Sequence, residues 1–124
     1  MIDFTNASYV KLSQWDVAAA HEKVGEHLTH GEQIYLAFKG MRDFVVFTSK
    51  RLIAVNVQGI TGKKIDYTSL PYARIQAFSV ETAGTFDLDS EMDLWFSGLG
   101  VVRLEFARGV DIRNLNRLIA DHTL

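Results

Sequence analysis

The sequence predicts a mainly β fold: seven short antiparallel strands, a closing C-terminal helix and an extra helix at the N-terminus. Three observations predict this class. Apolar and polar residues alternate with a period of two between about residues 32 and 107. Short turn-forming clusters rich in glycine and serine interrupt that stretch. From Asp111 onward, apolar side chains recur instead at helical spacing.

The composition predicts one folded domain without a general preference for nucleic acid. The chain has 124 residues, of which 48% are hydrophobic and 23% charged, and its formal net charge is -2. This apolar share suffices for a core, and the nearly neutral charge disfavours disorder and a generally basic surface. We expect residues 1–124 to form a single domain, with 1–30 as a helical extension and 31–124 as a barrel with its C-terminal helix.

The absence of cysteine narrows the chemistry and the compartment. It excludes disulfides, zinc ribbons, iron–sulfur clusters and thiol nucleophiles, and it fits a reducing environment. No apolar run approaches the roughly 20 residues that span a bilayer, and the first residues lack the features of a signal peptide. We therefore expect a cytoplasmic protein, for which peripheral association with the inner membrane stays open.

The first predicted element is a helix that begins near residue 13. Ser13 is placed as its N-cap with Asp16 three residues on, and Leu12 and Val17 are placed as a hydrophobic staple. The helix should run to about residue 28, where glycines weaken it. Its packing face consists of apolar residues at helical spacing, namely Val17, Ala20, Val24 and Leu28.

Seven strands follow in the order of the alternating segments. The first three, 32–39, 42–48 and 51–57, form an antiparallel meander with turns at 39–41 and 49–50. In the first of them, Ile34, Leu36 and Phe38 should share one face. The fourth strand, 63–68, should stop before Pro71, which cannot donate to a ladder. The remaining strands are expected at 75–81, 86–96 and 101–107.

The sixth strand and the last helix carry the clearest patterns. Apolar residues of the strand alternate with acidic ones; the apolar set is Leu88, Met92, Leu94 and Phe96, and the acidic set is Asp87, Asp89, Glu91 and Asp93. The helix should begin at a capping Asp111 and end near His122. Its apolar stripe is Ile112, Leu115, Leu118 and Ile119, of which Ile112, Leu115 and Ile119 are expected to be buried, while Arg113 and Arg117 face away.

In the order and spacing of several short motifs, the chain resembles the bacterial pleckstrin-homology (PH) domain family. The motifs are Gly31-Glu32, Arg42-Asp43, Thr48-Ser49-Lys50-Arg51-Leu52, Gln58-Gly59, Thr61-Gly62-Lys63-Lys64, Leu70-Pro71-Tyr72, Ser79-Val80-Glu81-Thr82-Ala83-Gly84, Phe86-Asp87-Leu88-Asp89 and the helix from Asp111. The resemblance implies two near-orthogonal antiparallel sheets, with the C-terminal helix plugging one end of the barrel. It also implies ring-like homo-oligomers and no enzymatic activity.

Two clusters suggest metal ligation, but neither has the required spacing. In the first, Gly25 stands where the zincin pattern needs its second histidine; the cluster is His21, Glu22, Glu26, His27 and His30. The acidic residues 87–93 lack the glycine and glutamate of a calcium loop, because Met92 and Gly98 occupy those positions. We predict no metal and no cofactor.

Catalysis is not expected. The chain has no G-x-S-x-G elbow, no standard phosphate-binding loop, and no histidine outside a predicted helix or its flank. The small-molecule-binding barrel, a third possible function, needs an open interior. Bulky inward-facing residues argue against it: Phe38, Phe78, Phe96 and Phe106.

A basic cluster and an apolar patch suggest binding. Because alternate hairpins of a meander lie at the same end, four bases should gather there: Lys39, Arg42, Lys63 and Lys64. They suggest a site for anionic phospholipid, as in PH domains that bind phosphoinositides, or else a solvated rim.

The second and third strands are apolar on both faces, so one face needs a cover, either the first helix or a second subunit. The patch expected at a subunit interface is Phe44, Val46, Leu52 and Ala54.

These observations lead to a ranked set of functions. The first is a non-catalytic PH-like module for binding and assembly that forms a homo-oligomer, either a twofold dimer or a ring, of which the family resemblance favours the ring. The second is a peripheral domain that binds anionic phospholipid. The expected partners are therefore further copies of the chain, another protein or an anionic membrane surface, and not nucleic acid.

Overall fold

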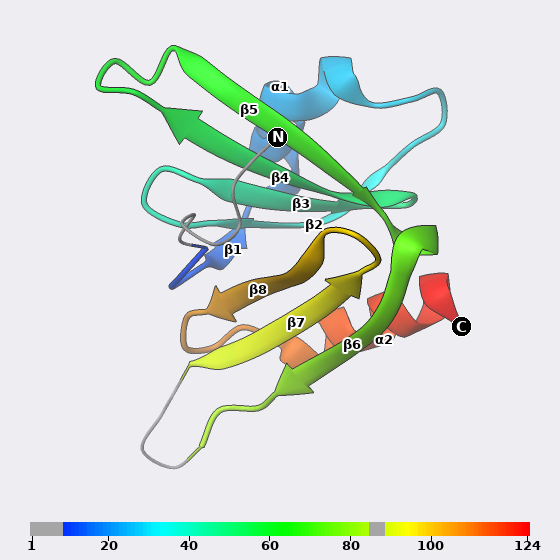
Figure 1. The fold of residues 1–124 in the computed structure, drawn as a ribbon. Helices are drawn as coiled ribbons and strands as arrows, with labels where there is room; N and C mark the ends of the chain where they lie inside the picture. Colours follow the sequence, from blue (N-terminus) through cyan, green and yellow to red (C-terminus); the bar gives the residue numbers. More distant parts are fainter. Residues whose placement is uncertain (1–8, 85–88) are drawn as a thin grey trace.

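The protein was analysed as a computed structural model that describes residues 9–84 and 89–124. In this part of the chain, eight strands form two antiparallel sheets, one of five strands in the order β1-β2-β3-β4-β5 and one of three in the order β6-β7-β8 (Figure 1). The strands of the larger sheet are β1 (Ser13–Trp15), β2 (Ile34–Lys39), β3 (Phe44–Thr48), β4 (Arg51–Gln58) and β5 (Lys64–Pro71). Those of the smaller sheet are β6 (Ile75–Glu81), β7 (Ser90–Phe96) and β8 (Gly100–Phe106).

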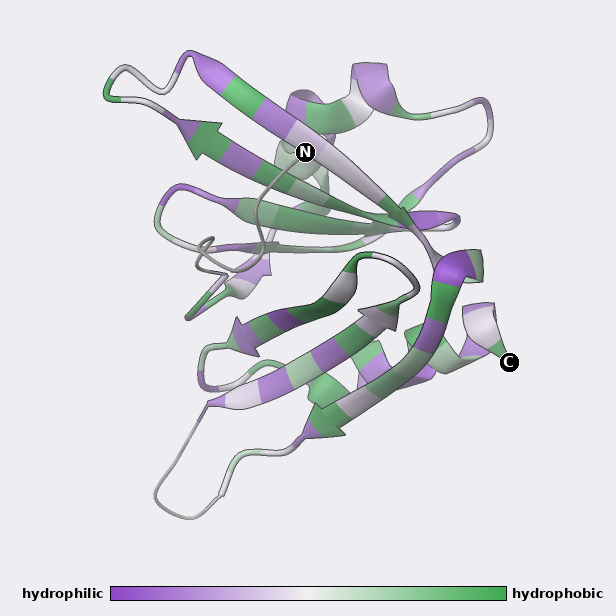
Figure 2. Cartoon of the chain, in the orientation of Figure 1, coloured by the Kyte–Doolittle hydropathy of each residue, from purple (hydrophilic) through white to green (hydrophobic). Residues whose placement is uncertain are grey.

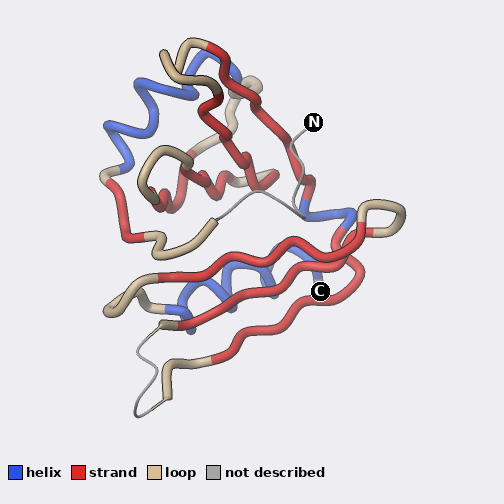
Figure 3. The backbone as a smooth tube through the Cα atoms, turned by 60° about the vertical axis from the view of Figure 1, so that its left-hand side comes forward, coloured by secondary structure: helices blue, strands red, loops and turns tan. Residues whose placement is uncertain are grey.

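Two α-helices and two short 3₁₀ turns complete the described elements. Helix α1 (Val17–Val24) continues into the 3₁₀ turn η1 (Gly25–His27), and η2 (Tyr72–Arg74) joins β5 to β6. Helix α2 (Ile112–Thr123) runs alongside the three-stranded sheet to the C-terminus (Figure 3). Neither α1 nor α2 is long and apolar enough to cross a membrane.

The two sheets and α2 share one main core. Of the aromatic residues predicted to fill it, Phe106 is fully buried and Phe38 and Phe96 are nearly so, which confirms these three positions; Phe47 is fully buried as well. Phe78 packs against the same cluster. The main core comprises Tyr9, Leu12, Phe38, Val45, Phe47, Leu52, Ala54, Leu70, Tyr72, Met92, Leu94, Phe96, Val102, Leu104, Phe106, Ile112, Leu115 and Ile119.

The predicted arrangement of two antiparallel sheets with a C-terminal helix is confirmed, but the closed seven-stranded barrel is wrong. An eighth strand, β1, lies at the start, and the sheets stay separate. The chain before β1 bridges them locally: the Leu12 amide donates to the Glu105 carbonyl at 3.0 Å, and the Ala107 amide donates to the Leu12 carbonyl at 2.8 Å. These bonds lie only at the end of β8, so among the described residues no continuous ladder joins the two sheets into a closed barrel.

The predicted start of the first helix is also wrong. Ser13 is not an N-cap; it belongs to β1 and lies opposite Lys39 of β2. The cap is Asp16, whose Oδ2 accepts the Ala19 amide at 3.1 Å. Leu12 is fully buried beside β8 rather than acting as a staple, and Val17 remains 37% exposed. Pairing with two sheets therefore overrides the local capping pattern.

A second core lies between α1 and the outer face of the five-stranded sheet. Ala20 and Val24 of α1 are fully buried there. They cover a sheet face that needs a cover because β3 and β4 are apolar along most of their length, whereas β7 alternates (Figure 2). The sheet contributes Ala37, Phe44, Val46, Ile53 and Val55 to this second core.

The register of β3 and β4 corrects the predicted interface patch. Phe44 lies opposite Val55 and Val46 opposite Ile53, so these four face α1. Leu52 and Ala54 face the main core instead. The four predicted residues, Phe44, Val46, Leu52 and Ala54, are therefore split between two faces and buried within one chain. The sequence left open whether the first helix or a second subunit covers the second face; in the structure the first helix, α1, covers it.

Two details of the strands differ from simple alternation. A register shift between Ile34 and Leu36 places Ile34 against the second core and Leu36 against the main core, so the two do not share a face. Strand β5 extends to Pro71, opposite Arg51. Since β5 is an edge strand, a residue without an amide proton is tolerated there.

The alternation within β7 and the apolar stripe of α2 are confirmed, whereas Asp89, predicted as part of the strand, precedes β7. Met92, Leu94 and Phe96 are buried, and Glu91 and Asp93 lie on the other face; Asp87 and Leu88, with Phe86, lie outside the described residues. Asp111 caps α2 by accepting the Asn114 amide at 3.2 Å. The helix buries Ile112, Leu115 and Ile119, while Arg113 and Arg117 are exposed.

Candidate functional site

Two neighbouring turns at one end of the five-stranded sheet form the first candidate site. We call this the hairpin end; it comprises the β2–β3 turn (residues 40–43), the β4–β5 loop (59–63) and the flanking Lys39 and Lys64. Both turns lie at the left in Figure 1. Arg42 joins them, since its Nη2 donates to the Gly59 carbonyl at 2.6 Å. The predicted gathering of alternate hairpins at one end is thus present.

The four predicted bases of the hairpin end are all exposed. Lys39 is positioned by β1, because its Nζ lies 5.1 Å from the centre of the Trp15 ring, a cation–π arrangement. Trp15 in turn packs edge-on against Phe44, with ring centres 4.9 Å apart. Lys63 ends the β4–β5 loop, and Lys64 opens β5 opposite Gln58. The bases therefore surround the two turns, and one of them rests on an aromatic ring.

Asp43, the acid beside these bases, has a structural role. Its Oδ1 accepts the Val57 amide at 2.9 Å and its Oδ2 accepts from Asn56 Nδ2 at 3.0 Å. The Asp43 carbonyl also accepts the Gly40 amide at 2.9 Å. The carboxylate thus ties the β2–β3 turn to β4 and is engaged by donors of its own chain.

Lys11 is a fifth base near this end that the sequence interpretation missed. A cavity of about 520 Å³ beside the β2–β3 turn is lined, among the described residues, by Val10, Lys11, Met41, Arg42 and Asp43. Lys11 has φ of 51°, the one positive value among described non-glycine residues. This bend lets the adjoining Leu12 pair with β8. No local sequence pattern predicts this position of Lys11, because β8, the strand that pairs with Leu12, is distant in the sequence.

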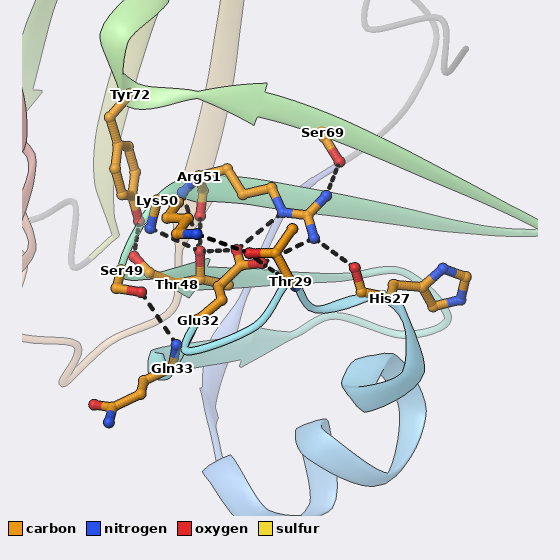
Figure 4. Close-up of polar contacts among 10 residues, drawn as sticks. All are labelled: His27, Thr29, Glu32, Gln33, Thr48, Ser49, Lys50, Arg51, Ser69 and Tyr72. Carbon is orange, nitrogen blue, oxygen red and sulfur yellow. Dashed lines mark hydrogen bonds and ion pairs between the residues drawn. The ribbon is translucent and has the colours of Figure 1, made fainter.

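A buried polar network lies at the opposite end of β3 and β4 (Figure 4). Glu32 is its centre, with a side chain that is 0% exposed. Arg51 binds both carboxylate oxygens, through Nε to Oε2 at 2.9 Å and through Nη2 to Oε1 at 3.0 Å. Thr48 Oγ1 donates to Oε2 at 2.5 Å, and the Thr29 amide and hydroxyl donate to Oε1 at 2.9 and 3.2 Å.

These contacts set the charge state of Glu32. Burial desolvates the carboxylate and by itself would raise its pKa, but the hydrogen bonds from Arg51, Thr48 and Thr29 outweigh this and lower the pKa to about 2. Glu32 is therefore ionised at neutral pH. Since five donors already point at its two oxygens, the carboxylate has little capacity left for a substrate.

The same network connects four segments of the fold. Arg51 Nη2 donates to the His27 carbonyl at 2.7 Å, and its Nη1 donates to Ser69 Oγ at 2.6 Å. The buried hydroxyl of Tyr72 donates to the Thr48 carbonyl at 2.7 Å. Burial raises the pKa of Tyr72, so this hydroxyl stays protonated. Segment 27–32, the β3–β4 turn, β5 and η2 are thereby held together.

The residues considered for metal binding do not converge in the structure. His27 stacks on Tyr67, with ring centres 4.1 Å apart, and His21 and His30 are exposed. Asp93 forms a paired contact with Arg103 at 2.9 and 3.0 Å. Within residues 9–84 and 89–124, no group of three or more histidine, cysteine or acidic side chains is placed to hold a metal ion.

Sequence comparison identifies relatives over almost the whole chain. Residues 3–123 match the family described as bacterial PH domain. The uncharacterized protein YjqA of Bacillus subtilis (strain 168) is 47% identical over 110 residues, which cover 87% of this chain and 88% of that protein.

Solved structures show the same fold. A DUF1696 family protein with a pleckstrin-homology domain from Shewanella loihica PV-4 has a TM-score of 0.82 and 40% identity, covering 93% of this chain and 99% of that one. A pleckstrin homology domain from Shewanella amazonensis SB2B has a TM-score of 0.68 and 44% identity, covering 96% of this chain and 93% of that one. With its two antiparallel sheets and C-terminal helix, the chain belongs to the bacterial PH domain family.

Proposed function

We propose that this protein is a non-catalytic binding module that docks on an anionic phospholipid surface through the hairpin end. The observation that carries the proposal is the Arg42 contact with Gly59, which unites two turns and their bases into one surface. Five exposed cations lie there: Lys11, Lys39, Arg42, Lys63 and Lys64. Each base near an anionic membrane adds to its attraction for lipid phosphates.

The chemistry of the hairpin end supports phosphate binding. Arginine and lysine form charge-assisted hydrogen bonds with phosphate oxygens. Lys11 and Arg42 line the cavity of about 520 Å³ beside the β2–β3 turn, which gives a headgroup a place to enter between two cations. The neighbouring carboxylate of Asp43 is turned to Val57 and Asn56, which stabilises the turn that presents Arg42.

Glu32, a buried carboxylate whose pKa departs clearly from its ordinary value, does not support a catalytic role. Glu32 is buried, and its lowered pKa of about 2 makes it a poor general base near neutral pH. Its donors come from three residues that hold the fold together. The network is therefore better suited to rigidity than to proton transfer.

Vesicle binding tests the proposal. Wild-type protein should co-sediment with vesicles of equal parts phosphatidylglycerol and phosphatidylcholine but not with phosphatidylcholine alone, and binding should weaken as salt is raised. The double variant Lys63→Glu/Lys64→Glu should bind about tenfold more weakly or worse. The matched control, Arg113→Glu/Arg117→Glu, makes the same change of charge on the exposed side of α2 and should bind like wild type. An equal loss of vesicle affinity in both variants would mean that the effect depends on net charge and not on the hairpin end. Failure of the wild-type protein to bind anionic vesicles would contradict the proposal.

A second candidate function, assembly into a homo-oligomer, is favoured by the outer face of the three-stranded sheet. Trp95 of β7 lies opposite Val101 of β8 and Ala77 of β6, and the two larger side chains remain 38% and 46% exposed. Exposed aromatic and aliphatic neighbours on a sheet face are typical of protein contacts. A ring would join this face to a different surface of the next copy, whereas a twofold dimer would join it to itself.

Light scattering distinguishes these arrangements. If the chain assembles through this face, wild-type protein should have a mass that is a multiple of 14.0 kDa, and Trp95→Ser/Val101→Ser should reduce it to one chain. An unchanged oligomer in that variant would move the contact elsewhere, and a wild-type mass of one chain would remove the assembly function.

A further inference from the structure

Two large apolar side chains at the hairpin end are fully exposed. Met41 in the β2–β3 turn is 98% exposed, and Ile60 in the β4–β5 loop is completely exposed. Among the described residues, only the terminal Leu124 approaches this, at 94%; the other exposed large apolar residues lie between 37% and 46%. Single exposed apolar residues are common, but two at the tips of joined turns are not scattered.

The two tips are neighbours because their turns are hydrogen-bonded. Arg42, directly after Met41, donates to the carbonyl of Gly59, directly before Ile60. Gly59 and Gly62 have φ of 75° and 68°, so the loop turns tightly on both sides of Ile60. The backbone therefore keeps this side chain away from both cores.

The surroundings of the tips match one kind of occupant. The bases of the hairpin end flank Met41 and Ile60 in the sequence and in the sheet. Cations beside protruding apolar side chains are complementary to an anionic bilayer, where phosphates lie at the surface and hydrocarbon lies just below. Stable attachment of a peripheral protein generally needs both an electrostatic and an apolar contribution.

We infer that Met41 and Ile60 insert below the headgroups of an anionic bilayer while the surrounding bases contact the lipid phosphates. This inference rests on the proposed function, since it specifies how the hairpin end would meet the membrane. The apolar insertion adds a part of the binding that salt does not screen, so wild-type protein should keep residual binding at high salt.

Removal of the apolar tips tests the insertion. The variant Met41→Ser/Ile60→Ser should bind vesicles of equal parts phosphatidylglycerol and phosphatidylcholine with an affinity at least about tenfold below that of wild type. High salt should abolish the binding that remains. Leu124→Ser removes an equally exposed apolar side chain far along the chain and should bind like wild type. Because all three positions are exposed, the variants should melt like the wild type.

A fluorescent label gives a direct measurement of depth. Since the chain has no cysteine, Met41→Cys, Ile60→Cys and Leu124→Cys each provide one attachment site for a polarity-sensitive dye. Labels at 41 and 60 should shift to shorter wavelength when vesicles are added, and the label at 124 should not.

The outcomes separate this inference from the function on which it rests. Protein that binds anionic vesicles but shows no spectral shift at 41 and 60, or loses no affinity in the serine variant, overturns insertion and leaves docking through the bases intact. Protein that does not bind these vesicles overturns both. An oligomer of wild-type protein that dissociates in the serine variant would assign the tips to a second copy of the chain and would also overturn insertion.

Discussion

The guanidinium of Arg51 and the carboxylate of Glu32 meet in a paired contact, Nε to Oε2 at 2.9 Å and Nη2 to Oε1 at 3.0 Å. Glu32 precedes β2, and Arg51 opens β4 across the β3–β4 turn. The side chain of Glu32 is 0% exposed and that of Arg51 is 19% exposed. Each side chain is therefore the main opposite charge near the other in a largely buried site.

Glu32 should make the protein sensitive to acid. Its folded pKa of about 2 lies below the ordinary value of 4.5, so its contribution to stability is present above pH 4.5 and is lost as the pH falls through about 2. From this group alone, the free energy of unfolding should fall by about 3 kcal/mol between about pH 5 and pH 2. Urea unfolding at a series of pH values measures it. Glu32→Gln should be less stable at pH 7 and should show a shallower fall, whereas parallel pH profiles of the two proteins would contradict the assignment.

Arg51→Lys should destabilise the fold by about 2 kcal/mol, although the charge is kept. A single ammonium cannot reach both oxygens of Glu32, the His27 carbonyl and Ser69 Oγ together. Chemical denaturation measures the loss. Arg74→Lys, at an exposed arginine of η2, is the control and should stay within about 0.5 kcal/mol of wild type. Equal stabilities for the two variants would show that the planar contact contributes nothing.

Tyr72→Phe should cost about 1–2 kcal/mol, because the Thr48 carbonyl loses its buried donor while the packing of the ring is kept. Thermal unfolding provides the comparison. Tyr35→Phe removes a hydroxyl from a side chain that is 42% exposed and should have a smaller effect. If the order is reversed, the Tyr72 bond does not stabilise the corner between β5 and β6.

Leu115→Asp should unfold the protein, because Leu115 is fully buried in the main core and an unpaired carboxylate there is strongly unfavourable. Circular dichroism and a melting curve report the outcome. Arg113→Asp introduces the same side chain at an exposed position of α2 and should keep the fold. A cooperative melt of Leu115→Asp at the wild-type temperature would mean that α2 does not cover the core.

Val46→Lys should destabilise the protein rather than merely change its mass. Val46 is fully buried in the second core beneath α1, so a lysine must either lose its charge or displace the helix. Ile65→Lys, on a residue that is 41% exposed in β5, is the control and should melt near wild type. A stable Val46→Lys protein that has become monomeric from an oligomer would restore this face as a subunit contact.

The sequence alone determined much of the fold because many of its elements are specified by local chemistry. The strands after residue 32, the two-residue turn at Ser49-Lys50 and the capped helix at Asp111 follow from period, turn residues and capping, all within a few positions. The same locality allowed the gathering of Lys39, Arg42, Lys63 and Lys64 at one end to be predicted, since a meander places alternate turns together.

The tertiary structure decided whatever depends on partners distant in the sequence. Ser13 has the side chain of an N-cap, but its backbone lies opposite Lys39, and Leu12 beside it bonds to Glu105 and Ala107. These pairings bring Lys11 to the hairpin end, which no nearby residue could indicate. A bulge in β2 likewise separates Ile34 from Leu36.

The faces of β3 and β4 show the same division most clearly. Their sequences revealed that both faces are apolar, but which residues share a face follows from the register that pairs Phe44 with Val55 and Phe47 with Leu52. A register shift of one residue would exchange the side chains that face the main core with those that face α1. The alternation within each strand does not determine that register. The docking of α1 then decided what covers Val46, because burial is a property of the packed chain and not of the segment that contains the residue.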